Sequence, residues 1–117
     1  MNDCESLVIK QAMKSPMKKK YGAILMYRNK IISVGYNYDT HISTKKYTSD
    51  YLPNVYSIHA EQDCINKVKN KTLLKKSILI LVCLGSGNKL KSCEPCCMCS
   101  HIIKKYKIRK VVSIYPI

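Results

Sequence analysis

The sequence contains no tryptophan and no phenylalanine, and only 7 of its 117 residues are acidic. No apolar run reaches the roughly 18 residues of a membrane-spanning helix. Residues 1–5 lack the features of a secretory signal peptide, and no internal repeat or low-complexity segment occurs. These absences argue against a membrane, secreted or repeat protein. We expect one domain over residues 1–117, located in the cytoplasm.

The 7 cysteines do not fit a disulfide scaffold. Their number is odd, no signal peptide precedes them, and four of them fall within Cys93–Cys99. A reducing compartment and a metal or catalytic role suit this pattern better.

The 21 lysine and arginine residues outnumber the 7 acidic residues, which gives a formal net charge of +14. Such an excess attracts polyanions, which suggests nucleic acid or phosphorylated substrates. Compositional bias is the alternative, because lysine, isoleucine, asparagine and tyrosine are all abundant and lysine greatly outnumbers arginine. We expect the charge of Lys18–Lys20 and Lys104–Lys110 to be largely solvated, since neither segment belongs to a motif of the site described below.

Apolar periodicity predicts helix, strand, strand, helix, strand, helix and strand, in that order. The predicted helices are Asp3–Ser15, Ile58–Lys69 (with Ser57 as N-cap) and Cys96–Tyr106, and the strands are Tyr21–Tyr27, Ile31–Tyr36, Ser77–Leu84 and Ile108–Tyr115. The continuously apolar third strand is expected at the centre of the sheet. This order predicts an α/β fold with a mixed four-stranded sheet, whose second and third helices share one face.

The segments between these elements carry further expectations. Residues 28–30 suit a hairpin turn, residues 71–76 a polar connector, and residues 85–91 a flexible turn. Gly22 and Gly35 suggest either close approach to a ligand or β-bulges. The long segment 37–57 has tyrosines interleaved with lysines and suggests a lid, which stacks on bases or packs on the body of the domain.

Two short motifs supply metal-binding chemistry: His59-Ala60-Glu61 and Pro95-Cys96-Cys97-Met98-Cys99. Pro95 suits the first turn of a helix, which places Cys96 and Cys99 on one face near its N-terminus. The helix dipole there favours thiolate, the form that binds zinc. Two sulfurs and the His59 imidazole leave a fourth tetrahedral position open, as in catalytic zinc sites. Glu61 is then a carboxylate free to move protons.

Each motif alone is ambiguous. His-Ala-Glu is common by chance, and Cys93 forms a second Cys-x-x-Cys pair with Cys96. A closed structural zinc site that uses Cys93 and another cysteine is therefore an alternative. Pro95 favours the pair Cys96 and Cys99.

The combined pattern His-x-Glu and Pro-Cys-x-x-Cys resembles the cytidine deaminase-like superfamily of zinc-dependent deaminases over about Leu7–Ile114. The resemblance implies a three-layer fold, here without the final helix and strand of the family. It also implies zinc on His59, Cys96 and Cys99, with attack of zinc-activated hydroxide on the amine-bearing ring carbon. Glu61 would shuttle the proton to the ring and the leaving ammonia.

The same resemblance suggests substrate contacts. Asn37, which ends Gly-Tyr-Asn, would hydrogen-bond the sugar or base, and the backbone amide of Ala60 would bind the base. Gly-Tyr-Asn is similar to deoxycytidylate deaminases, whereas Glu94–Cys99 is similar to tRNA adenosine, guanine and cytosine deaminases.

We therefore expect a hydrolytic deaminase of a cytosine-type nucleoside or nucleotide. The alternatives are deamination of a base in tRNA or single-stranded nucleic acid, and a catalytically silent, zinc-stabilised interaction module. A small-molecule substrate and a homo-oligomer are the expected partners, because Val111–Tyr115 would otherwise leave a sheet edge uncovered.

Overall fold

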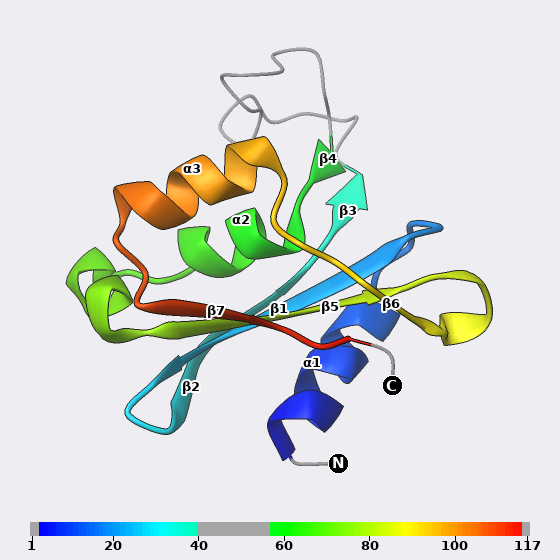
Figure 1. Cartoon of the computed structure of the whole chain (residues 1–117), viewed down its shortest axis with the longest axis horizontal. Coiled ribbons are helices and arrows are strands. Elements are labelled where there is room, and N and C mark those ends of the chain that lie inside the picture. The colour runs from blue at the N-terminus through cyan, green and yellow to red at the C-terminus, as the bar shows by residue number, and fades with distance from the viewer. Residues whose placement is uncertain (1–2, 40–56, 116–117) are drawn as a thin grey trace.

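The computed structural model describes residues 3–39 and 57–115. They form a mixed sheet with helices on both faces (Figure 1). The helices are α1 (Asp3–Met13), α2 (Ala60–Asn66) and α3 (Cys97–Lys105), with 3₁₀ segments η2 (Lys71–Lys76) and η3 (Ser86–Asn88). The sheet contains β1 (Lys20–Tyr27), β2 (Lys30–Tyr36), β5 (Ile78–Leu84), β6 (Leu90–Lys91) and β7 (Lys110–Ser113). A separate ribbon pairs β3 (Tyr38–Asp39) with β4 (Ser57–Ile58).

The sheet is organised around β5, as the continuous apolar run predicts. β1 lies antiparallel between β2 and β5. On its other side β5 pairs with β7 in parallel from Ile78↔Lys110, and with the short β6 at Cys83 and Leu84. The mixed sheet is thereby confirmed, and β6 adds a fifth strand to the four that were predicted.

The sheet is covered on both faces. Figure 1 shows α2 and α3 together on one face, as predicted, and α1 on the other. Side chains alternate along β1, so that Leu25 packs beneath α2 and α3 while Ile24 packs against α1. Both are fully buried, which explains why β1 and β5 are apolar at consecutive positions.

Two glycines allow these helices to approach the sheet closely. A Cβ atom at Gly22 would lie 2.4 Å from the carbonyl oxygen of Val8 in α1. At Gly35 it would lie 2.7 Å from both the Ala60 carbonyl oxygen and the Cys64 amide nitrogen in α2. The glycines therefore accommodate helix backbones. The expectation of a ligand or a bulge at these positions is wrong, since the one irregularity of the β1–β2 pairing lies at Leu25/Met26.

The second helix begins later than predicted. Ile58 belongs to β4 and pairs with Tyr38, so His59, not Ser57, is the N-cap of α2. The helix ends at Asn66, because Lys67 caps it and a 3₁₀ segment follows. The ribbon partner of β4 is far away in sequence, and local periodicity does not reveal such a pairing.

The connecting segments are more ordered than expected. The hairpin turn contains Arg28 and Asn29 with φ of 50° and 63°, the backbone of a two-residue turn. Residues 71–76 form η2, which buries Leu74, and residues 85–91 fold into η3 and β6. Residues 40–56, most of the predicted lid, lie outside the described residues.

The described strands leave β7 at an edge of the sheet, paired with β5 on one side. Self-association through this edge stays a prediction. Within residues 3–39 and 57–115, no helix is long and apolar enough to cross a membrane.

The tight contact at Gly35 gives a first testable prediction. Gly35→Ala should lower the free energy of unfolding by about 1–3 kcal/mol, the cost typical of overpacking, because helix backbone, not a flexible side chain, meets the new methyl group. Gly85→Ala is the matched control, since its Cβ would meet only the Lys91 side chain. Urea unfolding of both variants measures the difference, and equal stabilities would contradict the tight packing of α2.

Candidate active site

The N-termini of α2 and α3 converge at one end of their shared face. The ribbon strand β4 delivers His59 to the N-cap of α2, and the segment after β6 delivers Cys96 to the N-cap of α3. Cys99 follows in the first turn of α3 and is almost fully buried. Two residues forty positions apart from one another in sequence, His59 and Cys99, thus become neighbours.

The three side chains form a metal-binding geometry. His59 Nδ1 lies 3.4 Å from Cys96 Sγ and 3.4 Å from Cys99 Sγ. The three ligand atoms all lie within 4.8 Å of one another. A tetrahedral zinc ion with Zn–S bonds of about 2.3 Å and Zn–N bonds of about 2.0–2.1 Å would separate sulfur from nitrogen by about 3.5 Å. The donor set and its spacing therefore fit zinc.

The start of α3 differs from the prediction at Pro95. This proline precedes the N-cap and lies outside the first helical turn. Cys96 has extended backbone angles, and its Sγ accepts a hydrogen bond from the Cys99 amide at 3.4 Å. The sulfur predicted to bind metal therefore also caps the helix. Cys96 and Cys99 nevertheless lie close together at the N-terminus of a helix, as predicted.

Glu61 lies in the first turn of α2, and its side chain is only 6% exposed. Burial raises the pKa of its carboxyl above the usual value, while its own backbone amide, His59 and the Cys99 thiol act in the opposite direction. Among the described residues the metal-binding group consists of His59, Cys96 and Cys99, so Glu61 lies beside the group and is not part of it. The role of Glu61 in proton transfer stays a prediction.

Cys99 is poorly suited to remain a free thiolate. Burial, followed by Glu61 and Cys96, raises the pKa of its thiol. A metal ion that binds such a thiol deprotonates it, and the positive charge of the ion balances the negative charges of the thiolate and of the nearby carboxylate. The close packing of Cys99 against Glu61 therefore favours a cation between the two helices.

The competing cysteine register is not assembled. Cys93 is buried away from the three-residue group, and burial, Cys83 and Glu61 raise the pKa of its thiol to about 11, while a hydrogen bond with Ser113 lowers it. Cys97 follows the N-cap and is exposed. Within the described part of the chain, neither residue joins the metal-binding group.

A cavity of about 220 Å³ opens beside the metal-binding group. The described residues that line it are Met17, Tyr21, Asn37, His59, Glu61, Glu94 and Cys96. Two predicted metal ligands, the predicted proton carrier and one predicted substrate contact therefore share one cavity.

Asn37 lines the cavity but already makes structural hydrogen bonds. Its Oδ1 accepts from the Tyr21 amide at 2.8 Å, and its Nδ2 donates to the Lys19 carbonyl at 2.9 Å. An amide side chain can make further bonds, because Oδ1 has a second lone pair and Nδ2 a second proton. Ala60 lies between two lining residues with its methyl group buried, and its amide is at a helix position that lacks an intrahelical acceptor. The substrate contacts of both residues stay predictions.

Sequence patterns did not single out Tyr21, Met17 or Glu94 as cavity residues. Burial, then Cys83, Cys93 and Glu61, raises the pKa of the Tyr21 phenol to about 12. Tyr21 is therefore a neutral hydrogen-bonding group at neutral pH. The sequence places Tyr21 at the start of the predicted first strand, next to Gly22. Its position in the cavity depends on the fold and has no local sequence signal.

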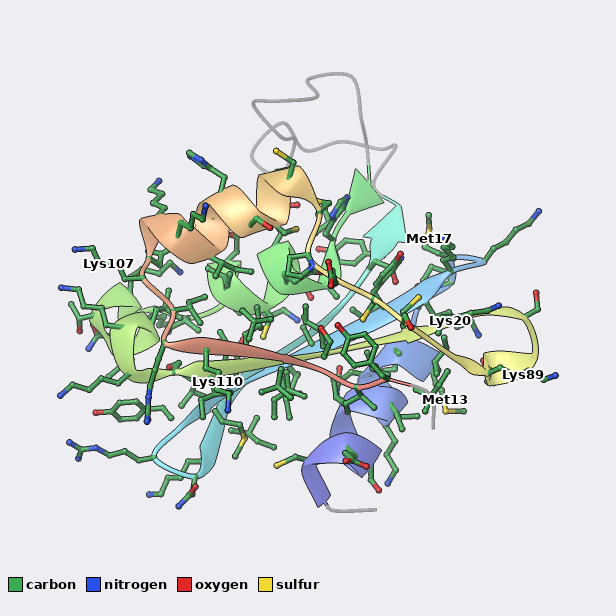
Figure 2. The ribbon with its side chains drawn as sticks, in the orientation of Figure 1. Met13, Met17, Lys20, Lys89, Lys107 and Lys110 are labelled. Atoms are coloured by element: carbon green, nitrogen blue, oxygen red, sulfur yellow. The ribbon has the colours of Figure 1, made fainter. Side chains whose placement is uncertain are left out.

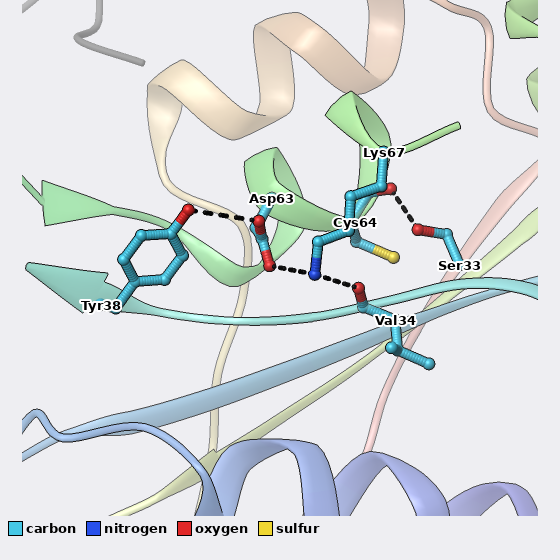
Figure 3. A network of polar contacts seen from close by, with 6 residues as sticks. All are labelled: Ser33, Val34, Tyr38, Asp63, Cys64 and Lys67. Carbon is cyan, nitrogen blue, oxygen red and sulfur yellow. Dashed lines mark hydrogen bonds and ion pairs between the residues drawn. The ribbon is translucent and has the colours of Figure 1, made fainter. Parts of the chain in front are cut away.

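A polar network holds α2 against β2 (Figure 3). The Lys67 ammonium lies 3.0 Å from Asp63 Oδ2 and donates to the Val34 carbonyl at 3.2 Å. The Tyr38 hydroxyl donates to Asp63 Oδ1 at 3.5 Å, which links the helix to the ribbon. Ser33 Oγ donates to the Cys64 carbonyl at 2.6 Å. These contacts fix the orientation of the helix whose N-terminus presents His59 and Glu61.

Comparison with known protein families gives one match over residues 3–115, to the cytidine and deoxycytidylate deaminase zinc-binding region. The superfamily resemblance of the two motifs is thereby confirmed. This match and the His59, Cys96 and Cys99 group together identify zinc as the cofactor. A comparison with curated protein sequences gave no match.

Solved structures with the same fold include two deaminases. The apo dCMP deaminase of cyanophage S-TIM5 has a TM-score of 0.61 at 22% identity, over 98% of this chain and 86% of the other. Guanine deaminase from Bacillus subtilis has a TM-score of 0.60 at 22% identity, over 98% of this chain and 65% of the other. The cyanophage enzyme in complex with dCMP and dUMP has a TM-score of 0.55 at 21% identity, over 97% and 82% of the two chains. At these identities the likeness establishes the fold.

The geometry predicts one zinc ion per chain with a defined set of ligands. Cys99→Ala should lose most of its zinc, because two ligands remain from a set of three, whereas Cys93→Ala and the neighbouring control Cys97→Ala should stay near one equivalent. Metal analysis of the purified proteins measures this directly. Loss of zinc from Cys93→Ala with retention in Cys99→Ala would show that the other cysteine register binds the metal.

Proposed function

Since the chain belongs to the family of cytidine and deoxycytidylate deaminases defined by their zinc-binding region, we propose that it catalyses zinc-dependent hydrolytic deamination of a cytosine-type nucleoside or nucleotide. The observation that carries this proposal is the His59, Cys96 and Cys99 group, two of whose members line the same cavity as the buried Glu61. An open fourth coordination position suits catalysis better than a purely structural role.

Each described group has a role in this proposal. Zinc, when bound, supplies a water whose pKa is lowered to about 7, and so a nucleophile at neutral pH. Glu61 would take one proton from the attacking water and pass it to the ring nitrogen. It would then carry a second proton, from the new hydroxyl group on the ring carbon to the amine, so that ammonia leaves as the carbonyl forms. Burial favours this exchange, because it keeps the affinity of the carboxyl for a proton above that of an exposed glutamate.

The substrate groups would be held by the walls of the cavity. Asn37 has one unused acceptor and one unused donor for a sugar hydroxyl or a base. The Ala60 amide, at the N-terminus of α2, lacks an acceptor within the helix and would donate a hydrogen bond to the carbonyl or ring nitrogen of the base. The structural likeness to a dCMP deaminase supports a free pyrimidine monomer.

A second enzymatic function has its own support. The segment Glu94-Pro95-Cys96 is similar to guanine and tRNA adenosine deaminases, and guanine deaminase is among the structural neighbours. A purine, or a base within a nucleic acid, is thus the alternative substrate. A catalytically silent zinc module is less well supported, since it has no use for the buried Glu61 beside its metal.

Glu61→Gln should retain zinc and fold but lose roughly 100- to 10,000-fold in turnover, the usual contribution of a positioned proton-transfer group. The amide has nearly the same shape but is too weak a base to take up a proton at neutral pH, and the substitution removes no residue of the metal-binding group. Zinc content and thermal unfolding serve as controls alongside ammonia release. Full activity in a zinc-replete Glu61→Gln protein would rule out the assigned role.

A substrate panel tests the choice of cytosine monomers. Cytidine, deoxycytidine and dCMP should be deaminated faster than guanine, adenosine or cytosine within an oligonucleotide, with ammonia release as the common readout. Turnover of the monomers should change little from low to high salt, because at most one phosphate is involved. Faster and strongly salt-dependent deamination of tRNA or an oligonucleotide would favour the alternative substrate.

A further inference from the structure

The positive charge of the chain is unevenly distributed. The sequence has no acidic residue between Asp63 and Glu94 and none after Glu94, although many of the lysines fall in these stretches. The fold collects much of this charge at one end of the molecule, which we call the basic end. Its members are all exposed: Arg28, Lys75, Lys76, Lys104, Lys107, Arg109 and Lys110.

The sheet register explains why these residues meet. Met26 of β1 pairs with Ile78 of β5, and Ile78 pairs with Lys110 of β7. Immediately beyond this row lie the Arg28 turn, the end of η2 and Arg109, which precedes β7. The Arg109 amide donates to the Ser77 carbonyl at 3.1 Å, which holds the last two segments together.

The basic end lies away from the cavity. Lys104 is eight positions after Cys96 along α3, which corresponds to about 12 Å at a rise of about 1.5 Å per residue. Figure 2 shows Lys107 at one end of the molecule and Met17, a cavity residue, toward the other. A ligand on the basic end therefore does not need to occupy the catalytic cavity.

Other cations nearby are already used within the fold and are not counted in this surface. Lys67 pairs with Asp63, and the Lys71 ammonium donates to the carbonyls of Ile65, Asn66 and Val68 at the end of α2. Burial lowers the pKa of Lys71, in accord with this internal role. The members of the basic end, in contrast, are all exposed.

Two half-buried tyrosine rings lie beside the basic end, one next to Arg28 and one next to Lys105, the exposed neighbour of Lys104. The Arg28 guanidinium lies 5.3 Å from the centre of the Tyr27 ring, and the Lys105 ammonium lies 5.3 Å from the centre of the Tyr106 ring. Cations interleaved with aromatic rings are typical of surfaces that follow a single-stranded nucleic acid, where rings stack on bases and cations contact phosphates.

We propose that the basic end is a docking surface for the phosphate backbone of single-stranded nucleic acid, independent of the base sequence and separate from the deaminase cavity. This proposal replaces the expectation from the sequence that the charge of Lys104–Lys110 is only solvated. A membrane surface is the less favoured partner. Of the exposed large apolar side chains in the described part of the chain, Leu7 and Met13 lie on α1 and Tyr115 follows β7. Only Ile31 is near the charge, so apolar groups for insertion into a bilayer do not cluster there.

An oligothymidylate is the most selective probe, because thymine has no exocyclic amine and cannot be deaminated. A labelled strand of about 20 nucleotides exceeds the roughly 4–16 nucleotides that a small domain covers. The zinc-loaded protein should bind it with a Kd of about 10⁻⁴–10⁻⁶ M at physiological salt, and more tightly at low salt. Fluorescence anisotropy across a salt series gives both the affinity and its salt dependence.

Two variants that lose the same number of positive charges distinguish binding by the basic end from an effect of the net charge of the protein. The first replaces Lys76, Lys107, Arg109 and Lys110 by glutamine; the control replaces the exposed Lys10, Lys14, Lys18 and Lys89 by glutamine. The first should bind at least tenfold more weakly at low salt. Its slope of log K against log salt should fall by about 2–3, at about 0.7 for each phosphate that is no longer neutralised. The control should change less than threefold.

Zinc content and thermal unfolding verify that both variants are folded. If the fourfold variant of the basic end is unstable, the double variant Lys107→Gln/Lys110→Gln takes its place. Equal weakening in both variants would overturn the proposal, because net charge alone would then explain binding. So would absence of binding to oligothymidylate, or stronger binding to vesicles of anionic phosphatidylserine. Since oligothymidylate is not a substrate, this outcome is independent of whether cytosine monomers are deaminated.

Discussion

The contact between the α2 backbone and Gly35 is the constraint on which the site depends. It brings the helix close enough to β2 for the Ser33 hydroxyl to reach the Cys64 carbonyl and for Lys67 to bridge Asp63 and the Val34 carbonyl. The helix is therefore fixed along its length and not merely at one end. The position of the helix also fixes His59 and Glu61, because they occupy the N-cap and the first turn of α2. The second half of the site comes from α3, whose place follows from the parallel crossover between β5 and β7.

Much of this organisation was predictable from the sequence, for identifiable reasons. The run Ser77–Leu84 is apolar at consecutive positions because both faces of β5 are covered, so its central place was recognisable. The two motifs specified the metal-binding group, since residue type and spacing encode ligand chemistry directly. The structure brings all three predicted ligands together and places Glu61 beside them.

The errors came from contacts between distant parts of the chain. Ile58 fits the apolar stripe of a helix, but its pairing with Tyr38 places it in a strand. Gly35 suggested a ligand or a β-bulge, because the helix that fills its space is contributed by a later segment. Tyr21 reaches the cavity through the pairing of β1 with β5 and the bonds of Asn37 to the main chain. None of these relations leaves a local sequence signal.

The dual use of Cys96 ties the integrity of a helix to an inorganic ion. Its sulfur accepts a hydrogen bond from the Cys99 amide and also faces His59, so one atom caps the start of the helix and belongs to the metal-binding group. Thiolate is a better acceptor than thiol, because hydrogen bonds to charged groups are shorter and stronger. Zinc bound to Cys96 would therefore also stabilise the first turn of α3. A serine at this position would separate the two tasks, since a hydroxyl caps helices well but is not among the usual ligands of zinc.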